Sequence, residues 1–138
     1  MRGLSRRDGR GVPTPPTSPP PDHRAALGSY GERVAVRALT DAGLQVLDRN
    51  WRCREGELDV VARDGDALVF CEVKTRSGTG FGHPAEAVTS AKRRRLRQLA
   101  AAWLVAHDQH APDLRFDVVG VHVPVSGPPR VVHLRNAF

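Results

Sequence analysis

Two short acidic motifs in the middle of this sequence, Gly56-Glu57-Leu58-Asp59 and Glu72-Val73-Lys74, decide the predicted fold. The residues between them are mostly apolar except around Asp64-Gly65, a dipeptide typical of a tight turn between two strands. The pattern therefore predicts a β-hairpin with strands over residues 58–63 and 68–75. Because side chains alternate between the faces of a strand, Glu72 and Lys74 share one face.

The register of this hairpin decides which charged residues face one another. If Arg63 pairs with Leu68 across a four-residue turn, Asp59 lies directly opposite Glu72. The alternative, a two-residue turn, is expected to pair Asp59 with Phe70. In both registers the acidic residues share a face. Two facing carboxylates repel each other unless a cation lies between them, so the hairpin predicts a cation site.

Asp59, Glu72 and Lys74 are the residue types that metal-assisted hydrolysis of a phosphodiester requires. Carboxylates hold the metal, which polarises the phosphate and acidifies water, and a positive group stabilises the developing charge. Oxygen ligands favour Mg²⁺ or Mn²⁺ over zinc. The alternative is a Glu–Lys pair on a solvated strand. However, Glu72 follows the apolar run 68–71, which is typical of an internal strand, where charged residues are rare unless paired.

Helices and further strands surround the hairpin. The predicted elements, in chain order, are a helix over 28–42 ended by Gly43, a strand from 44 towards 51, the two hairpin strands, a helix over 90–107, a strand over 115–123 and a short strand over 131–134. The order α-β-β-β-α-β, with the short terminal strand, predicts an α/β fold in which a mixed β-sheet is flanked by helices.

Glu32 has two interpretations that the sequence leaves open. It precedes Val36 and Leu39 by four and seven residues, so it lies in line with the buried stripe of the first helix and would point towards the metal. Ser29 and Glu32 also fit the S-x-x-E capping box, in which Glu32 would only return to the backbone of Ser29.

Five basic residues occupy six positions, 92–97, in the first turns of the second helix, where cations oppose the helix dipole. This unfavourable placement indicates that the basic residues bind phosphate. The alternative is that they form a solvated helix face. The helical period places Lys92 towards the sheet and Arg94 outward. The predicted nucleic-acid contacts are Lys92, Arg93, Arg94, Arg97 and, with the loop 77–82, Arg76.

Composition narrows the class of protein. The chain has 138 residues, a net charge of +6 and a pI of about 10.6, which favours nucleic acid as partner. Its two cysteines lack zinc-site spacing, and no apolar run is long enough to span a membrane, so we expect a cytoplasmic protein. Residues 1–27 are rich in Arg and Pro and predict a disordered arm before a folded domain over 28–138.

Several segments together resemble the bacterial YraN family, which is similar to PD-(D/E)xK endonucleases and to archaeal Holliday-junction resolvases. The segments that carry the resemblance are Gly31-Glu32, Arg49-Asn50-Trp51-Arg52, Gly56-Glu57-Leu58-Asp59, the run from Val69 to Arg76, Lys92, the run from Arg115 to Val119, and Asn136-Ala137-Phe138. The resemblance implies the restriction-endonuclease-like form of the mixed sheet. Leu58 replaces the proline of the superfamily's name, and Cys71 stands where an aliphatic residue is usual.

Carried over residue by residue, the resemblance implies that Asp59 and Glu72 bind the metal and that Lys74 lies near the attacking water. Glu32 would match the helix acid of resolvase-like members, and Lys92 the basic position on the following helix. The implied activity is a Mg²⁺-dependent endonuclease on DNA, with branched or damaged DNA among its substrates. The alternatives are a nucleic-acid-binding protein of the same fold with little turnover, and an interaction module in a DNA-processing complex. Symmetric cleavage of a four-way junction would require a homodimer.

Overall fold

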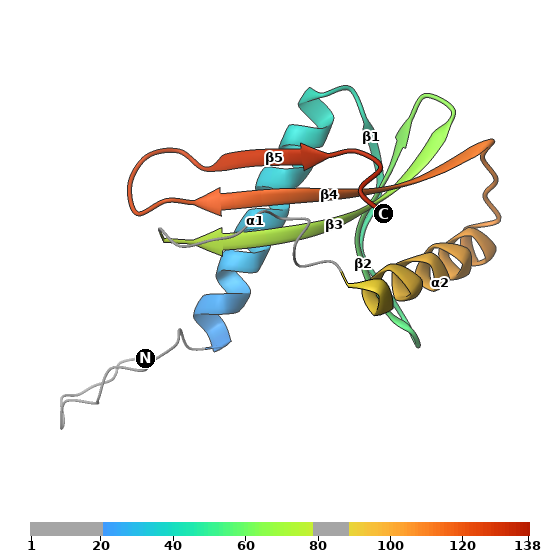
Figure 1. Ribbon diagram of the computed structural model, residues 1–138, viewed down its shortest axis with the longest axis horizontal. Coiled ribbons are helices and arrows are strands. Elements are labelled where there is room, and N and C mark those ends of the chain that lie inside the picture. The colour runs from blue at the N-terminus through green and yellow to red at the C-terminus, as the bar shows by residue number, and fades with distance from the viewer. Residues whose placement is uncertain (1–20, 79–88) are drawn as a thin grey trace, which may run out of the picture.

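The computed structural model describes residues 21–78 and 89–138, and in them it has the predicted mixed α/β architecture (Figure 1). Its elements, in chain order, are α1 (Pro21–Asp41), β1 (Gln45–Cys53), β2 (Gly56–Asp64), β3 (Ala67–Ser77), α2 (Ser90–His107), β4 (Asp113–Val123) and β5 (Arg130–Leu134). Within these residues the strands form one sheet in the order β1-β2-β3-β4-β5. Only β3 and β4 are parallel, and α2 lies in the crossover connection that such a pair requires.

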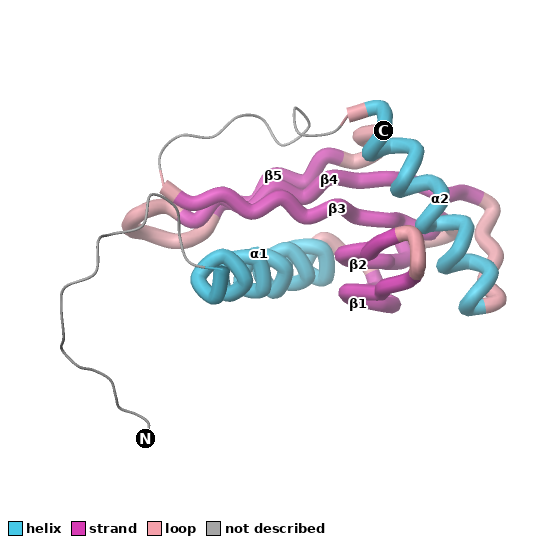
Figure 2. The backbone as a smooth tube through the Cα atoms, turned by 90° about the horizontal axis from the view of Figure 1, so that it is seen from below, coloured by secondary structure: helices cyan, strands magenta, loops and turns pink. Residues whose placement is uncertain are grey.

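The central strands of the sheet are buried on both faces because a helix packs against each face (Figure 2). Leu39 of α1 belongs to the core cluster that contains Val69 of β3. Leu99 of α2 belongs to the opposite cluster, which contains Leu68 and Phe70. Successive residues of β3 therefore point to different helices, which confirms that the apolar run is an internal strand.

The hairpin has the first of the two predicted registers. Arg63 pairs with Leu68, and Asp64 pairs with Ala67, so the connecting loop consists of Gly65 and Asp66 alone. The expectation that a two-residue loop would bring Asp59 opposite Phe70 is therefore wrong, because this short loop produces the same register as the longer turn. Gly65 has φ +59°, a left-handed conformation that glycine adopts without steric cost.

Helix α1 begins at Pro21, seven residues before the predicted start at Gly28. Proline is favoured in the first helical turn, and the Ala25-Ala26-Leu27 run that follows has high helix propensity. The capping-box interpretation of Glu32 is consequently wrong, because Ser29 lies inside the helix. There the Ser29 hydroxyl accepts a hydrogen bond from Arg33 Nη1 at 3.1 Å. Gly43, at φ +97°, ends the helix as predicted.

Three other predictions concern the arm and the loop, membrane spans, and the two cysteines. Residues 1–20 of the predicted disordered arm and residues 79–82 of the predicted loop lie outside the described part of the chain. None of the helices in the described part is long and apolar enough to cross a membrane. Cys53 and Cys71 are both free thiols, and Cys71 is fully buried, as its place in an apolar run predicts.

Candidate active site

The predicted carboxylates meet where β2 and β3 separate. The paired ladder between these strands ends at Val60 and Cys71. One step further, the backbone N–H of Val73 donates a hydrogen bond to Asp59 Oδ2 at 2.8 Å. The side chain of Asp59 thus takes the place of a strand partner. This bond fixes Asp59 beside Glu72, across the gap between the two strands.

Two lysines converge on a single oxygen of Glu72. Lys74 Nζ lies 3.0 Å from Oε2, and Lys92 Nζ lies 2.9 Å from the same atom. Lys74 comes from the same face of β3 as Glu72, and Lys92 reaches the site from the first turn of α2. The structure therefore brings together Asp59, Glu72, Lys74 and Lys92, and it confirms that Lys92 faces the sheet.

The electrostatics of Asp59 are unusual for an aspartate. Burial, followed by the negative charge of Glu72, raises its pKa from 3.8 to about 7, although the hydrogen bond from Val73 opposes the change. Glu32 and Glu57 raise this pKa further. A buried carboxylate near other carboxylates is stabilised when a cation binds beside it, so this environment favours a metal ion.

The two lysines are perturbed in opposite directions. Burial, together with the neighbouring Lys92, lowers the pKa of Lys74. Burial also opposes the charge on Lys92, but its contacts with Lys74 and Glu72 raise the pKa of Lys92 overall. Groups whose pKa values are pushed apart can take different roles in acid–base chemistry. Lys74 therefore releases its proton more easily than Lys92 does.

Glu32 approaches the carboxylates from α1, on the other face of the sheet. Its charge contributes to the raised pKa of Asp59, and with Glu57 it lines a hollow between α1 and β1. In the described residues, no three Asp, Glu, His or Cys side chains are arranged to hold a metal together. Asp59 and Glu72, which line one cavity, are the two carboxylates that could hold a metal there. Mg²⁺ is typically bound by one or two carboxylates, with waters and substrate phosphate completing its shell.

Gly31 lets α1 come close enough to β3 for Glu32 to reach this site. A Cβ atom at Gly31 would overlap the side chain of Thr75 on β3. We expect Gly31→Ala to lower the free energy of unfolding by about 1–3 kcal/mol, because the helix must shift away from the sheet. Gly28→Ala is the matched control, since a Cβ there meets nothing within 4 Å. Denaturant unfolding of the two variants measures the difference; equal stabilities would contradict the close approach.

The predicted basic residues occupy different surroundings. Arg93 and Arg94 are exposed on the first turns of α2, and Arg76 is exposed near the end of β3. The guanidinium of Arg97 lies 4.9 Å from the centre of the Phe116 ring, so this side chain covers the core. Arg95 was not singled out from the sequence, yet with Lys92 it lines a cavity that Asp59 and Glu72 also line. Its position three residues after Lys92, on the same helix face, was the available signal.

The cavity beside the carboxylates has a volume of about 220 Å³. Its lining residues are Gly56, Glu57, Asp59, Glu72, Lys92, Arg95, Leu96 and Leu99. The lining thus combines two leucines with five charged side chains. The cavity is therefore a partly desolvated space in which electrostatic interactions are stronger than in bulk water.

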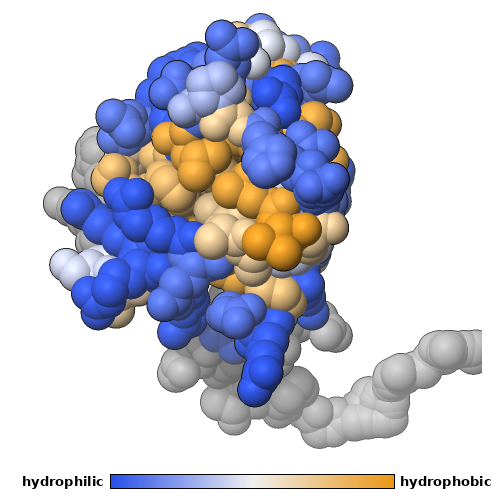
Figure 3. All heavy atoms as spheres, turned by 90° about the vertical axis from the view of Figure 1, so that its right-hand side faces the viewer, coloured by the Kyte–Doolittle hydropathy of each residue, from blue (hydrophilic) through white to orange (hydrophobic). Residues whose placement is uncertain are grey.

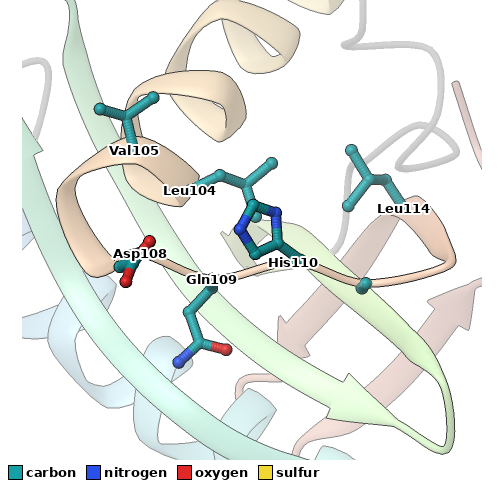
Figure 4. Close-up of a pocket in the computed structure, with 7 residues that line it drawn as sticks. Leu104, Val105, Asp108, Gln109, His110 and Leu114 are labelled. Carbon is teal, nitrogen blue, oxygen red and sulfur yellow. The ribbon is translucent and has the colours of Figure 1, made fainter.

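A larger hollow lies at the C-terminal end of α2, around Leu104, Val105 and Leu114 (Figure 4). On that side of the molecule, Figure 3 shows apolar atoms among hydrophilic ones, and Val105 is 83% exposed. Asp108 and His110 are the ionisable side chains that line this hollow. It lacks the paired carboxylates and lysines of the β2–β3 site.

Comparison with known proteins identifies relatives of this chain. The family model described as "Uncharacterised protein family UPF0102" matches residues 31–121, which include all four residues that meet at the site. A UPF0102 protein of Beutenbergia cavernae is 62% identical over 111 residues, which are 80% of this chain and 94% of the relative. A UPF0102 protein of Frankia casuarinae is 58% identical over 113 residues, which are 82% and 96% of the two chains. These names state no activity.

Proposed function

We propose that this chain, which belongs to the UPF0102 family, is a metal-dependent endonuclease acting on DNA. UPF0102 is the YraN family that the sequence resembles. The observation that carries the proposal is the convergence of Asp59, Glu72, Lys74 and Lys92 at the separation of β2 and β3. A protein that only binds a polyanion has no use for buried carboxylates at the binding site. Metal-assisted phosphodiester hydrolysis uses both the carboxylates and the lysines.

The donor set fits Mg²⁺ or Mn²⁺, which Asp59 and Glu72 would hold. A bound ion would supply positive charge at the phosphate and acidify a water molecule. Lys74, which lies beside Glu72, would orient that water for attack on the phosphate. The positive charge of Lys92 would stabilise the negative charge that develops on the phosphate. Glu32 adds negative charge that strengthens the attraction for the metal.

The substrate class rests on the charge around the cavity. Arg93, Arg94 and Arg95 follow Lys92 on the helix that borders the site, where they can contact phosphates on either side of the cleaved bond. We infer DNA, with branched or damaged DNA among the substrates, and a cytoplasmic location. Symmetric cleavage of a four-way junction would be carried out by a homodimer.

One observation favours the alternative, a nucleic-acid-binding protein without turnover. Glu72 Oε2 already has two lysine partners, and an oxygen paired in this way must exchange a partner before it can hold a metal. Binding without cleavage would leave this ion-pair cluster intact.

A cleavage panel distinguishes the two functions. The wild-type protein is incubated with linear duplex, nicked duplex, single-stranded and four-way-junction DNA, in Mg²⁺, Mn²⁺ or EDTA. We expect cleavage with either metal and none in EDTA, and a loss of at least about 100-fold in Asp59→Ala and Lys74→Ala. Asp66→Ala, which changes an exposed acid in the turn of the same hairpin, should cleave like wild type. If wild type cleaves none of these substrates with either metal, the endonuclease proposal is wrong.

A further inference from the structure

A third hollow lies beside the candidate active site, on the α1 side of the sheet. It has a volume of about 500 Å³ and is lined by Ala25, Gly28, Ser29 and Glu32 of α1, Asn50 and Arg52 of β1, and Glu57 of β2. Glu57 also lines the active-site cavity, so the two spaces adjoin at this residue. The volume falls in the range of about 300–1,000 Å³ that is typical of small-ligand sites.

Gly28 keeps this hollow open although the fold does not require a glycine there. A Cβ at Gly28 would meet nothing within 4 Å, in contrast to Gly31, whose Cβ would overlap Thr75. A glycine inside a helix lowers stability by roughly 0.5–1 kcal/mol relative to alanine. The backbone of Gly28 is helical and needs no special freedom. The packing of the helix therefore does not require glycine at position 28, and the absence of a side chain there leaves room in the hollow.

The lining of the hollow combines acceptors with donors. Glu32, Glu57 and the Ser29 hydroxyl supply acceptors, and Arg52 supplies donors. Arg52 Nε lies 3.3 Å from Glu57 Oε2, and its side chain is 80% exposed. Two carboxylates on the wall repel a phosphate. A neutral group that carries amino donors and ring acceptors suits this lining, and the edge of a nucleobase has this chemistry.

Asn50 adds a side-chain amide, which can both donate and accept, to the same wall. It lies on β1 between the pairs Arg49–Val60 and Trp51–Leu58, and its φ is +51°. Asparagine is one of the few residues that tolerate this left-handed conformation. The paired residues on either side hold the amide at the rim of the hollow.

We propose that the hollow between α1 and β1 binds an unpaired nucleobase of the nucleic-acid strand held at the active site, with a preference for bases that carry an exocyclic amino group. The inference rests on the proposed function, because the strand reaches the hollow from the adjoining cavity. A base stacked and paired in a duplex does not enter such a pocket, whereas an unpaired base can be splayed into it. The hollow would thereby select branched or single-stranded substrates over intact duplex.

Binding in EDTA tests the pocket separately from cleavage. Fluorescence anisotropy compares a fully paired duplex with duplexes that carry one unpaired cytosine, guanine, adenine or thymine, or one unpaired abasic nucleotide. We expect the duplexes with unpaired cytosine, guanine or adenine to bind roughly 10-fold more tightly than the abasic duplex, with thymine the weakest of the four bases.

Gly28→Leu adds a side chain whose Cβ meets nothing within 4 Å, and it improves helix propensity, so the variant should fold, occupy the hollow and lose the preference for the unpaired base. Ala26→Leu, at an exposed position on α1 outside the lining, is the matched control and should keep the preference. If base-bearing and abasic duplexes bind equally to wild type, or if Gly28→Leu keeps the preference, the pocket is wrong and the endonuclease proposal stands. If wild type binds no nucleic acid at all, both proposals are wrong.

Discussion

Asp59→Asn is expected to abolish cleavage and, at the same time, to stabilise the folded protein at pH 8. Asparagine keeps an oxygen that can accept the hydrogen bond from Val73 N–H, so the local geometry survives. It removes the negative charge that the proposed metal requires, and we expect a loss of at least about 100-fold in cleavage. A substitution that disables the protein while stabilising its fold is the signature of a residue retained for chemistry rather than for structure.

The stabilisation follows from the raised pKa of Asp59, about 7 in the folded protein against 3.8 in the unfolded chain. Between these two values Asp59 binds more protons in the folded than in the unfolded state, so the contribution of Asp59 to stability falls as pH rises from about 4 to about 7. Above pH 7 the full cost of the buried charge is present. At about 1.4 kcal/mol per pKa unit, this cost is on the order of 4 kcal/mol, and asparagine does not incur it.

Chemical denaturation in EDTA between pH 4 and pH 8 measures this effect. The difference in stability between Asp59→Asn and wild type should grow with pH and level off above pH 7. Asp66→Asn, at the exposed turn of the same hairpin, should follow wild type. Adding Mg²⁺ should stabilise wild type more than Asp59→Asn, because the ion relieves the same repulsion. An Asp59→Asn protein that is less stable than wild type at pH 8 would contradict this account.

The sequence predicted the parts of the site whose signals are local. Strand alternation placed Glu72 and Lys74 on one face, and the pairing of Arg63 with Leu68 was one of the two registers that the sequence left open. The helical period correctly aimed Lys92 at the sheet. These rules act over a few residues, so they hold whatever the rest of the chain does.

Other features depend on contacts between segments far apart in the sequence. Glycine is required at position 31 because a Cβ there would overlap Thr75, which lies 44 residues later, and no local sequence pattern predicts this contact. The predicted start of α1 is too late because the prolines before residue 21 are typical of a disordered segment, although good helix formers follow them. Asp117 was not singled out from the sequence, because two of its partners, His133 on β5 and the backbone of Asn136, lie 16 and 19 residues later.

Asp117→Ala is expected to lower the free energy of unfolding by about 3–5 kcal/mol, because it leaves a buried network of charged groups without its centre. Asp117 is fully buried on β4. Its carboxylate accepts two hydrogen bonds from Arg115, both at 3.0 Å, and one from the backbone N–H of Asn136 at 2.9 Å. His133 Nε2 lies 2.7 Å from Oδ2. Arg115 also donates to Asp64 at 2.9 Å, so the network joins β2, β4, β5 and the chain end.

Thermal or denaturant unfolding measures this loss, with Asp113→Ala, an exposed acid on the same strand, as a control that should change stability by no more than about 0.5 kcal/mol. Burial is the largest single influence on Asp117 and opposes its charge, but the hydrogen bonds from Arg115, Asn136 and His133 together lower its pKa. The stability that it contributes is therefore present above pH 3.8 and is lost as pH falls below that value. An acid-induced loss of stability that is unchanged in Asp117→Ala would contradict the role of the network.

Asp59 on β2 is partly buried and Asp117 on β4 is fully buried, yet the pKa values of these two carboxylates shift in opposite directions. The protein surrounds Asp117 with donors and leaves Asp59 among other acids, with a single hydrogen bond from the backbone. Asp117→Ala should therefore reduce stability and keep cleavage at temperatures where the variant is folded, whereas Asp59→Asn should do the reverse. Measuring both properties in both variants separates the carboxylate that holds the fold from the one that we assign to the metal.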